Sequence, residues 1–185
     1  TTDEDVAIEI TLNATDIETT DLQYSIQQSP SNGTITGNTG ALGDKTVIYT
    51  PNANWNGTDS FTYTVSDSEL TSDPATVTIT VAAVNDAPVA NAINISTNED
   101  IDLSFSFDMS DVDGDDLDVH IMSNPSNGTL TGEVQDVIMK YTPNENWHGT
   151  DSFNYKAYDG TSSGTQLSEL ATVTITVASV NDAPV

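Results

Sequence analysis

The sequence predicts an all-β protein built from two tandem sandwich domains joined end to end. Three observations lead to this prediction: the chain repeats itself once, its apolar residues alternate with polar residues, and no segment shows the period of a helix. We therefore expect two repeats, residues 1–86 and 87–185, with the first strand of the first repeat truncated. The repeated motifs are "SNGTITG" at 31–37 and "SNGTLTG" at 126–132, "YTPNANWNGTDSF" at 49–61 and "YTPNENWHGTDSF" at 141–153, and "NDAPV" at 85–89 and 181–185.

Strands are expected where apolar residues recur at every second position, because a half-buried strand points alternate side chains into the core. The second repeat has six such stretches, and the short "GTLTG" beginning at Gly128 adds a seventh strand. Seven strands in about 95 residues is typical of an immunoglobulin-like sandwich. The Asn-Gly pairs at 32–33, 56–57 and 127–128 predict turns with positive φ. The alternating stretches are 6–12, 22–26, 61–65 and 77–81 in the first repeat and 93–95, 101–107, 117–121, 137–141, 153–157 and 173–177 in the second.

The net charge limits the possible partners of the chain. There are 29 acidic residues against 3 lysines and arginines, a formal net charge of −26. Nucleic acids and anionic membranes attract proteins through Lys and Arg, so the composition argues against both. No apolar run approaches the roughly 18 residues of a membrane-spanning helix, which argues against membrane insertion. The acids could simply form a solvated, solubilising surface, unless they gather at particular loops.

Strand order predicts that the acids do gather. If successive strands run up and down, alternate loops share one end of each sandwich, and the end of the first repeat meets the start of the second. Partial clusters are expected at the two outer ends, from Asp16, Glu18 and Asp67 and from Glu99, Asp151, Asn181 and Asp182. The complete cluster, expected at the junction of the repeats, consists of Glu4, Asp59, Asn85, Asp86, Asp111, Asp113 and Asp159.

Calcium is the ion that this chemistry favours. Ca²⁺ takes six to eight oxygen ligands in flexible geometry, whereas Mg²⁺ needs a compact octahedron. The chain has no cysteine and 2 histidines, so zinc, copper and iron sites have few ligands to use. The stretch "DVDGDD" from Asp111 is not an EF-hand loop, because its glycine stands fourth and no glutamate follows at the twelfth position.

The motifs "VNDAPV", "NED", "DVDGD" and "YTPNxNWxGTDSFxY" resemble the bacterial cadherin-like tandem repeats of large surface and secreted adhesins. The resemblance covers essentially the whole chain. Animal cadherins, a more distant resemblance, bind several Ca²⁺ ions between domains, and carried over to this sequence their ligands correspond to the seven junction residues given above. One departure is that the two-acid motif before the sixth strand is reduced to Asp59, which leaves two or three ions per junction open.

The resemblance implies a non-enzymatic, extracellular extender: Ca²⁺-rigidified repeats that hold a binding domain away from a bacterial surface, in adhesion and biofilm formation. Its partners would be neighbouring repeats of a longer chain. An alternative is a module that itself binds polysaccharide or a like domain on another cell. Exposed aromatic residues would favour this alternative, but Trp55 and Trp147 are expected to pack at the sandwich edge. The loop at 162–168, longer than its counterpart at 68–72, is a second place where a ligand could bind.

Overall fold

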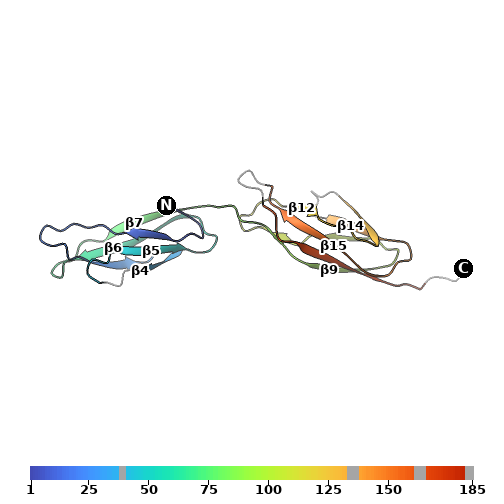
Figure 1. Cartoon of the computed structure of the whole chain (residues 1–185), viewed down its shortest axis with the longest axis horizontal. Helices are drawn as coiled ribbons and strands as arrows, with labels where there is room; N and C mark the ends of the chain where they lie inside the picture. The colour runs from blue at the N-terminus through green and yellow to red at the C-terminus, as the bar shows by residue number, and fades with distance from the viewer. Residues whose placement is uncertain (38–40, 133–137, 161–165, 182–185) are drawn as a thin grey trace. The chain divides into compact units, whose positions relative to one another are not determined.

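The computed structural model describes residues 1–37, 41–132, 138–160 and 166–181, which form two compact units. Unit 1 comprises residues 1–84 and unit 2 residues 85–185. All regular structure in the described residues is β-strand (Figure 1). Unit 1 is a sandwich of two sheets, and unit 2 is a sandwich of two sheets with an additional two-stranded sheet. The predicted fold class is therefore confirmed. The boundary lies two residues before the predicted one, because Asn85 and Asp86 form hydrogen bonds with residues of unit 2.

Two sheets of unit 2 face each other across its core. One has the strand order β10-β14-β13 and the other β12-β15-β16-β9, and all pairs are antiparallel except β16 with β9. The strands are β8 (Val89–Ala90), β9 (Ile93–Asn98), β10 (Leu103–Ser106), β11 (Met109–Ser110), β12 (Asp118–Ile121), β13 (Gly128–Thr131), β14 (Ile138–Pro143), β15 (Gly149–Tyr158) and β16 (Ala171–Ala178).

The first segment of unit 2 contributes to both sides of the sandwich. β8 pairs antiparallel with β11, which continues the chain after β10, and β9 pairs parallel with β16. Ala90, Ile93 and Ile95 of this segment pack against the hydrophobic core. The segment thereby forms a small two-stranded sheet with β11 and adds an edge strand, β9, to the four-stranded sheet.

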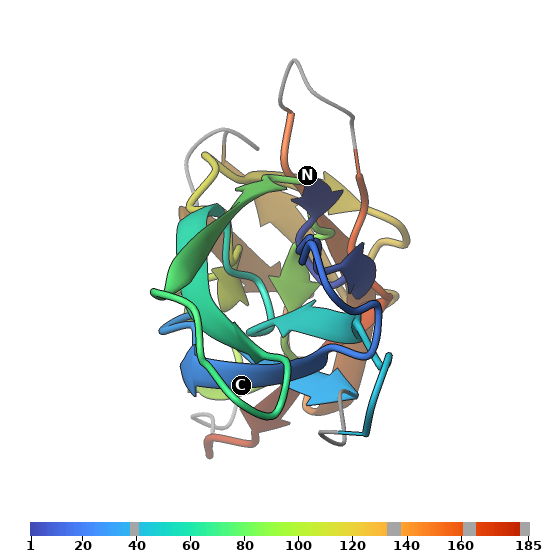
Figure 2. The same cartoon turned by 90° about the vertical axis from the view of Figure 1, so that its left-hand side faces the viewer.

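Unit 1 repeats this architecture with the sheets β2-β5-β4 and β1-β7-β6-β3. Figure 2 views this unit along its strands and shows β7 and β6, in green, on the side opposite the dark blue β2 and cyan β5. β1 pairs with Val81 and Ala82, in the register in which the last two residues of β9 meet β16. The strands are β1 (Thr2–Asp3), β2 (Ile8–Thr11), β3 (Gln23–Gln28), β4 (Gly33–Gly37), β5 (Thr46–Pro51), β6 (Gly57–Ser66) and β7 (Ala75–Ala82).

Equivalent tyrosines, Tyr49 and Tyr141, are fully buried members of the two hydrophobic cores. A Cβ atom at Gly33 would lie 2.5 Å from the ring of Tyr49, and one at Gly128 would lie 2.4 Å from that of Tyr141. The prediction of positive φ is wrong for these two glycines, which lie at the starts of β4 and β13 and serve to admit the ring. It is confirmed for Gly57, whose φ is 138°.

Both tryptophans, Trp55 and Trp147, are partly buried and pack against the hydrophobic cores, as expected. Each ring also lies over the glycine two residues later, with a distance of 3.1 Å from the nearest ring carbon to the position of a Cβ. Most of the loop at 162–168 lies outside the described residues.

Candidate metal centre

The loop between β11 and β12 brings three carboxylates of unit 2 together. Asp111, Asp113 and Asp115 each offer an oxygen, and these oxygens lie within 4.8 Å of one another. The loop can fold this tightly because Gly114 turns the chain with a φ of 80°, a conformation that favours glycine. The backbone N–H of Asp113 donates to Oδ1 of Asp111 at 2.8 Å, which fixes the first turn of the loop.

The segment that opens unit 2 lies against this loop and against the end of β15. The side-chain amide of Asn85 donates to Oδ2 of Asp159 at 2.7 Å, and the backbone N–H of Asp86 donates to Oδ2 of Asp113 at 2.8 Å. Gln166 adds a bond from Nε2 to the carbonyl oxygen of Asn85 at 2.5 Å. Five of the seven residues predicted for the complete cluster, all of them in unit 2, are therefore joined by one network: Asn85, Asp86, Asp111, Asp113 and Asp159.

The carboxylates of the cluster repel one another. Oδ2 of Asp111 is buried, and no described residue donates a hydrogen bond to it. Burial raises the pKa of Asp115, and repulsion from the carboxylates of Asp111, Asp113 and Asp159 raises it further. Like charges held this closely favour either protonation or a bound cation. We find that the donor set, carboxylates with an amide beside them, fits a hard divalent cation such as Ca²⁺.

The two predicted ligands in unit 1 have protein partners there. Glu4 is 3% exposed and accepts a hydrogen bond from the N–H of Val84 at 2.6 Å. Asp59 is 5% exposed, and each of its oxygens accepts two hydrogen bonds. Its donors are the N–H groups of Ser31, Ser60 and Asn32 and the hydroxyl of Tyr49, at 3.0, 2.9, 2.9 and 3.1 Å.

These bonds make Asp59 a clasp between β6, the turn before β4 and the buried tyrosine of β5. Burial alone would raise the pKa of Asp59, but the backbone bonds from Asn32, Ser31 and Ser60 outweigh it and lower the pKa. The same hydrogen bond stabilises the protonated phenol of Tyr49: burial and the bond to Asp59 raise the pKa of Tyr49 to about 12. The role of Asp59 as an ion ligand stays a prediction, and it competes with four hydrogen bonds.

The three predicted acids at the other end of unit 1 form ordinary turns. Oδ1 of Asp16 accepts from the N–H groups of Glu18 and Thr19, both at 2.9 Å. Oδ1 of Asp67 accepts from the N–H groups of Leu70 and Glu69, and these bonds lower the pKa of Asp67. In unit 2 the equivalents of Asp16 and Asp67 are Asp111 and Asp159, which join the carboxylate cluster instead.

At the end of unit 2 that corresponds to the Glu4 and Asp59 end of unit 1, Asp151 repeats the clasp of Asp59, with bonds from Ser126, Asn127, Ser152 and Tyr141. Glu99 accepts from the N–H of Val180 at 2.5 Å, as Glu4 does from Val84. Asn181 follows β16 as an exposed residue, whereas Asp182 lies outside the described residues.

Comparison with known proteins agrees with this architecture. The family model described as "Bacterial Ig domain" matches residues 1–80 and again residues 85–177. The chain belongs to this family. Its two bacterial Ig domains coincide with the two units and with the tandem repeat seen in the sequence.

Among curated proteins, "Integrin beta-like protein A" of Dictyostelium discoideum is 31% identical over 212 residues. That alignment covers 98% of this chain and 11% of the relative, so the chain spans about a tenth of the length of that protein. Among solved structures, Drosophila N-cadherin EC1-4 matches with a TM-score of 0.55 and 16% identity, over 91% of this chain and 44% of the other. This likeness shows that the bacterial Ig domains share the cadherin-like fold.

A further solved structure, the endo-fucoidan hydrolase MfFcnA4 from glycoside hydrolase family 107, matches with a TM-score of 0.42 and 24% identity, over 97% of this chain and 27% of the other. No helix among the described residues is long and apolar enough to cross a membrane.

Two residues of the cluster in the second bacterial Ig domain are absent from the predicted ligands. Asp115 belongs to the three-carboxylate group, and the alternation Asp111, Asp113, Asp115 was the signal that could have identified it. Gln166 follows a segment with no counterpart in the first repeat, so the internal repeat gave no indication of its bond to Asn85.

Proposed function

We propose that the second bacterial Ig domain binds Ca²⁺ at the cluster formed by its opening segment, its β11–β12 loop and the end of β15. The observation that carries this proposal is the group of Asp111, Asp113 and Asp115 oxygens within 4.8 Å of one another. One of these carboxylates, Asp111, has a buried oxygen that receives no hydrogen bond from any described residue. The ligands would come from Asp86, Asp111, Asp113, Asp115 and Asp159, with the Asn85 amide beside them. Bound Ca²⁺ would supply positive charge to offset the mutual repulsion of these groups.

The opening segment gives the site a mechanical consequence. Asn85 and Asp86 are the first residues of unit 2, and both take part in the network of the cluster. Pro88, which follows them, fixes its own φ and restricts Ala87. An ion held here would restrict the linker between the repeats further. The predicted participation of Glu4 and Asp59 would extend the same effect to the first domain.

From these features we infer that the chain is a non-catalytic extender of an extracellular protein, in which Ca²⁺ limits the freedom between consecutive repeats. The tandem arrangement supports this role, because in a chain of tandem repeats each repeat contacts only its neighbours, and the freedom at each junction determines how far the chain extends. Adhesion at a bacterial surface is the context in which such an extender would act. Neighbouring repeats would then be its principal partners.

Small-angle X-ray scattering of the chain, with Ca²⁺ and after chelation, tests the mechanical role. We expect a narrower distribution of interatomic distances with Ca²⁺ and a broader one after chelation. Identical scattering in the two states would remove the mechanical role from the ion.

Binding to a glycan array, or Ca²⁺-dependent self-association, would instead favour a module that recognises polysaccharide or a like domain. The packing of Trp55 and Trp147 against the cores disfavours a carbohydrate-stacking role for them.

A further inference from the structure

The connection between β6 and β7 in unit 1 contains the peptide bond between Asp73 and Pro74. Of the 7 prolines in the chain, Pro74 is the one that follows an aspartate. Both residues are exposed. Their counterparts in unit 2, Glu169 and Leu170, are exposed as well, although β9 pairs with the strand that follows them. The exposure of this connection is therefore a feature of both units.

An Asp-Pro bond differs chemically from other peptide bonds in two ways. The carboxyl group of an aspartate can attack the carbonyl carbon of its own residue, because the attack closes a five-membered ring. The nitrogen of proline belongs to a tertiary amide and carries no hydrogen, so it accepts a proton more readily and leaves as a secondary amine. The bond between Glu169 and Leu170 has neither property, because its ring would be larger and its nitrogen belongs to a secondary amide.

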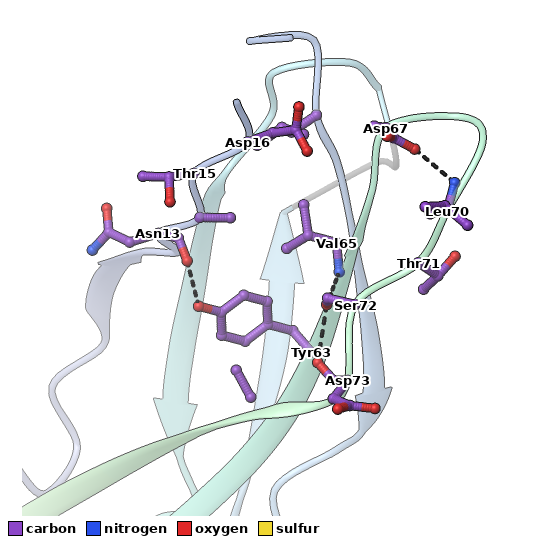
Figure 3. A pocket seen from close by; sticks show the side chains of 13 residues that line it. Asn13, Thr15, Asp16, Tyr63, Val65, Asp67, Leu70, Thr71, Ser72 and Asp73 are labelled. Atoms are coloured by element: carbon purple, nitrogen blue, oxygen red, sulfur yellow. Dashed lines mark hydrogen bonds between the residues drawn. The ribbon is translucent and has the colours of Figure 1, made fainter. Parts of the chain in front are cut away.

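A serine hydroxyl is held at the carbonyl oxygen of this bond. The hydroxyl of Ser72 donates to the carbonyl oxygen of Asp73 at 2.9 Å (Figure 3). The N–H of Ser72 donates to the carbonyl oxygen of Val65 at 2.8 Å, and its hydroxyl oxygen accepts from the N–H of Val65 at 3.0 Å. A donor fixed in this way stabilises the negative charge that a carbonyl oxygen gains when its carbon is attacked.

Unit 2 holds a serine in the same way at a different bond. Ser168 donates to the carbonyl oxygen of Glu169 at 2.8 Å and exchanges two hydrogen bonds with the backbone of Ala157. The serine arrangement is thus common to both repeats, whereas the Asp-Pro pair occurs in unit 1 alone. The two units therefore separate the effect of the serine from the effect of the bond beside it.

The carboxyl group of Asp73 is available for the attack. The other titratable side chains that line the same groove are Asp16, Tyr63 and Asp67, and no lysine lines it. Among the described residues, none donates a hydrogen bond to the Asp73 carboxyl group and none forms an ion pair with it. No competing interaction therefore has to be broken before this group can react.

We propose that the bond between Asp73 and Pro74 is an acid-sensitive site at which the chain cuts itself, with water as the co-reactant. An oxygen of the Asp73 carboxyl group bonds to the carbonyl carbon of Asp73 and forms a cyclic anhydride. The bond from this carbon to the nitrogen of Pro74 breaks, and the nitrogen keeps the electron pair and takes up the carboxyl proton. Water then opens the anhydride to the Asp73 side chain and a new α-carboxyl group, so the sum is hydrolysis of one peptide bond.

The cut would divide the chain at the entry to β7. Residues 74–185 would stay attached to residues 1–73 through the pairing of β7 with β6 and β1. Ile79 and Val81 of β7 are also buried in the core of unit 1. These contacts are all noncovalent, so tension along the chain would separate the two pieces. Acid would thereby convert a continuous chain into one that releases its two parts under load.

Mass spectrometry of the full chain tests the proposal, after incubation below the usual carboxyl pKa of about 3.9, neutralisation and denaturation. We expect two products, residues 1–73 and 74–185, that form more slowly as the incubation pH is raised above this value. Before denaturation the two products should elute together in size-exclusion chromatography, and separate elution would contradict their retention by β7. The bond between Glu169 and Leu170 should stay intact.

Variants assign the cut to the Asp-Pro pair. Pro74→Ala and Asp73→Glu should each slow it at least tenfold. The double substitution Glu169→Asp and Leu170→Pro places the same pair beside the serine of unit 2 and should create a second cut there. Absence of the first cut in the wild type, or cleavage of many bonds at similar rates, would overturn the proposal.

The contribution of the fold is measured at a pH at which circular dichroism shows that the chain is folded. The wild type should be cut faster under these conditions than in urea at the same pH, because urea frees the serine hydroxyl. Ser72→Ala should slow the cut of the folded chain at least threefold and leave the rate in urea unchanged. Equal rates for the folded and the urea-unfolded wild type would contradict the role of the held hydroxyl.

Discussion

At the scale of single residues, Asp59 and Asp151 illustrate how an acidic side chain can serve the fold. Each is buried at the start of the long strand that contains the "GTDSF" motif, and each accepts hydrogen bonds from a preceding turn and from a buried tyrosine. The sequence analysis predicts Asp59 as a ligand of the complete cluster and Asp151 as a ligand of a partial cluster, because strand order is expected to bring the loop that contains this motif to an end of the sandwich where acids gather. The donors in the turn and on the tyrosine are 10–28 residues away, so local sequence could not reveal them.

We predict that Asp59→Asn lowers the stability of unit 1 by about 2–4 kcal/mol, because an amide nitrogen would face donors that now bond to a carboxylate. The pKa of Asp59 is lowered in the folded state, so its stabilisation is complete above the unfolded pKa of about 3.9. It is lost as the pH falls through the lower folded value. The stability difference between wild type and variant, measured by urea unfolding, should therefore shrink in strong acid.

The matched control for this prediction is Asp151→Asn, which removes the same clasp from unit 2. It should destabilise unit 2 and leave the transition of unit 1 unchanged. A stability difference between wild type and Asp59→Asn that grows as the pH falls below 3.9 would contradict the explanation.

A second residue-scale prediction concerns Gly33. Its Cβ in Gly33→Ala would lie 2.5 Å from the ring of Tyr49 and 2.6 Å from the carbonyl oxygen of Thr50. We expect a loss of about 1–3 kcal/mol in the free energy of unfolding, the usual cost of overpacking a core. Thr36→Ala, at an exposed position of the same strand, serves as the control and should cost much less. Thermal unfolding of the two variants makes the comparison, and equal losses would refute the steric explanation.

At the scale of elements, β7 and β16 have the same sequence, "ATVTITVA", in different surroundings. β16 is paired on both sides, with β15 and β9, whereas β7 is paired on both sides only at Val81 and Ala82 among the described residues. The burial differs accordingly: Ala171 and Val173 are buried, whereas Ala75 is exposed and Val77 half-buried.

We therefore predict that amide hydrogen exchange is faster in residues 75–80 than in residues 171–176. Amides that point away from β6 have no strand partner among the described residues, whereas their counterparts bond to β9. From Thr76 and Thr172 onward each amide and its preceding residue are identical in the two stretches, so their intrinsic exchange rates cancel. Equal protection of the two stretches would show that the edge of β7 is covered in solution.

Much of the fold at this scale was predictable from the sequence. The alternation of apolar residues predicted where the strands lie. The repeat strengthened this assignment, because the same alternating segments occur in both copies. The division of the first strand between β8 and β9 was not predictable, since both parts alternate alike and only tertiary pairing distinguishes them. For the site, the expected up-and-down strand order predicted that Asn85 and Asp86 lie near Asp111 and Asp113, but it did not predict that Asp115 joins them.

At the scale of the whole molecule, the net charge of −26 makes two effects of Ca²⁺ possible, general screening and binding at a site. We predict that Ca²⁺ raises the unfolding temperature of unit 2 more than NaCl of equal ionic strength does. At a hundredfold excess over the dissociation constant, site binding adds about 2.7 kcal/mol. Differential scanning calorimetry would measure both, and equal stabilisation by the two salts would support the solvated acidic surface instead.

The most direct test of the central claim, that the aspartate loop of unit 2 binds Ca²⁺, is calorimetric titration of three proteins: wild type, Asp111→Asn and Asp16→Asn. Asp16 is the counterpart of Asp111 in unit 1, and both Asn variants keep an oxygen that can accept the turn hydrogen bonds. The claim predicts that wild type and Asp16→Asn bind Ca²⁺ with the same highest affinity and that Asp111→Asn loses this binding. Equal effects of the two substitutions, or no saturable binding by the wild type, would contradict it.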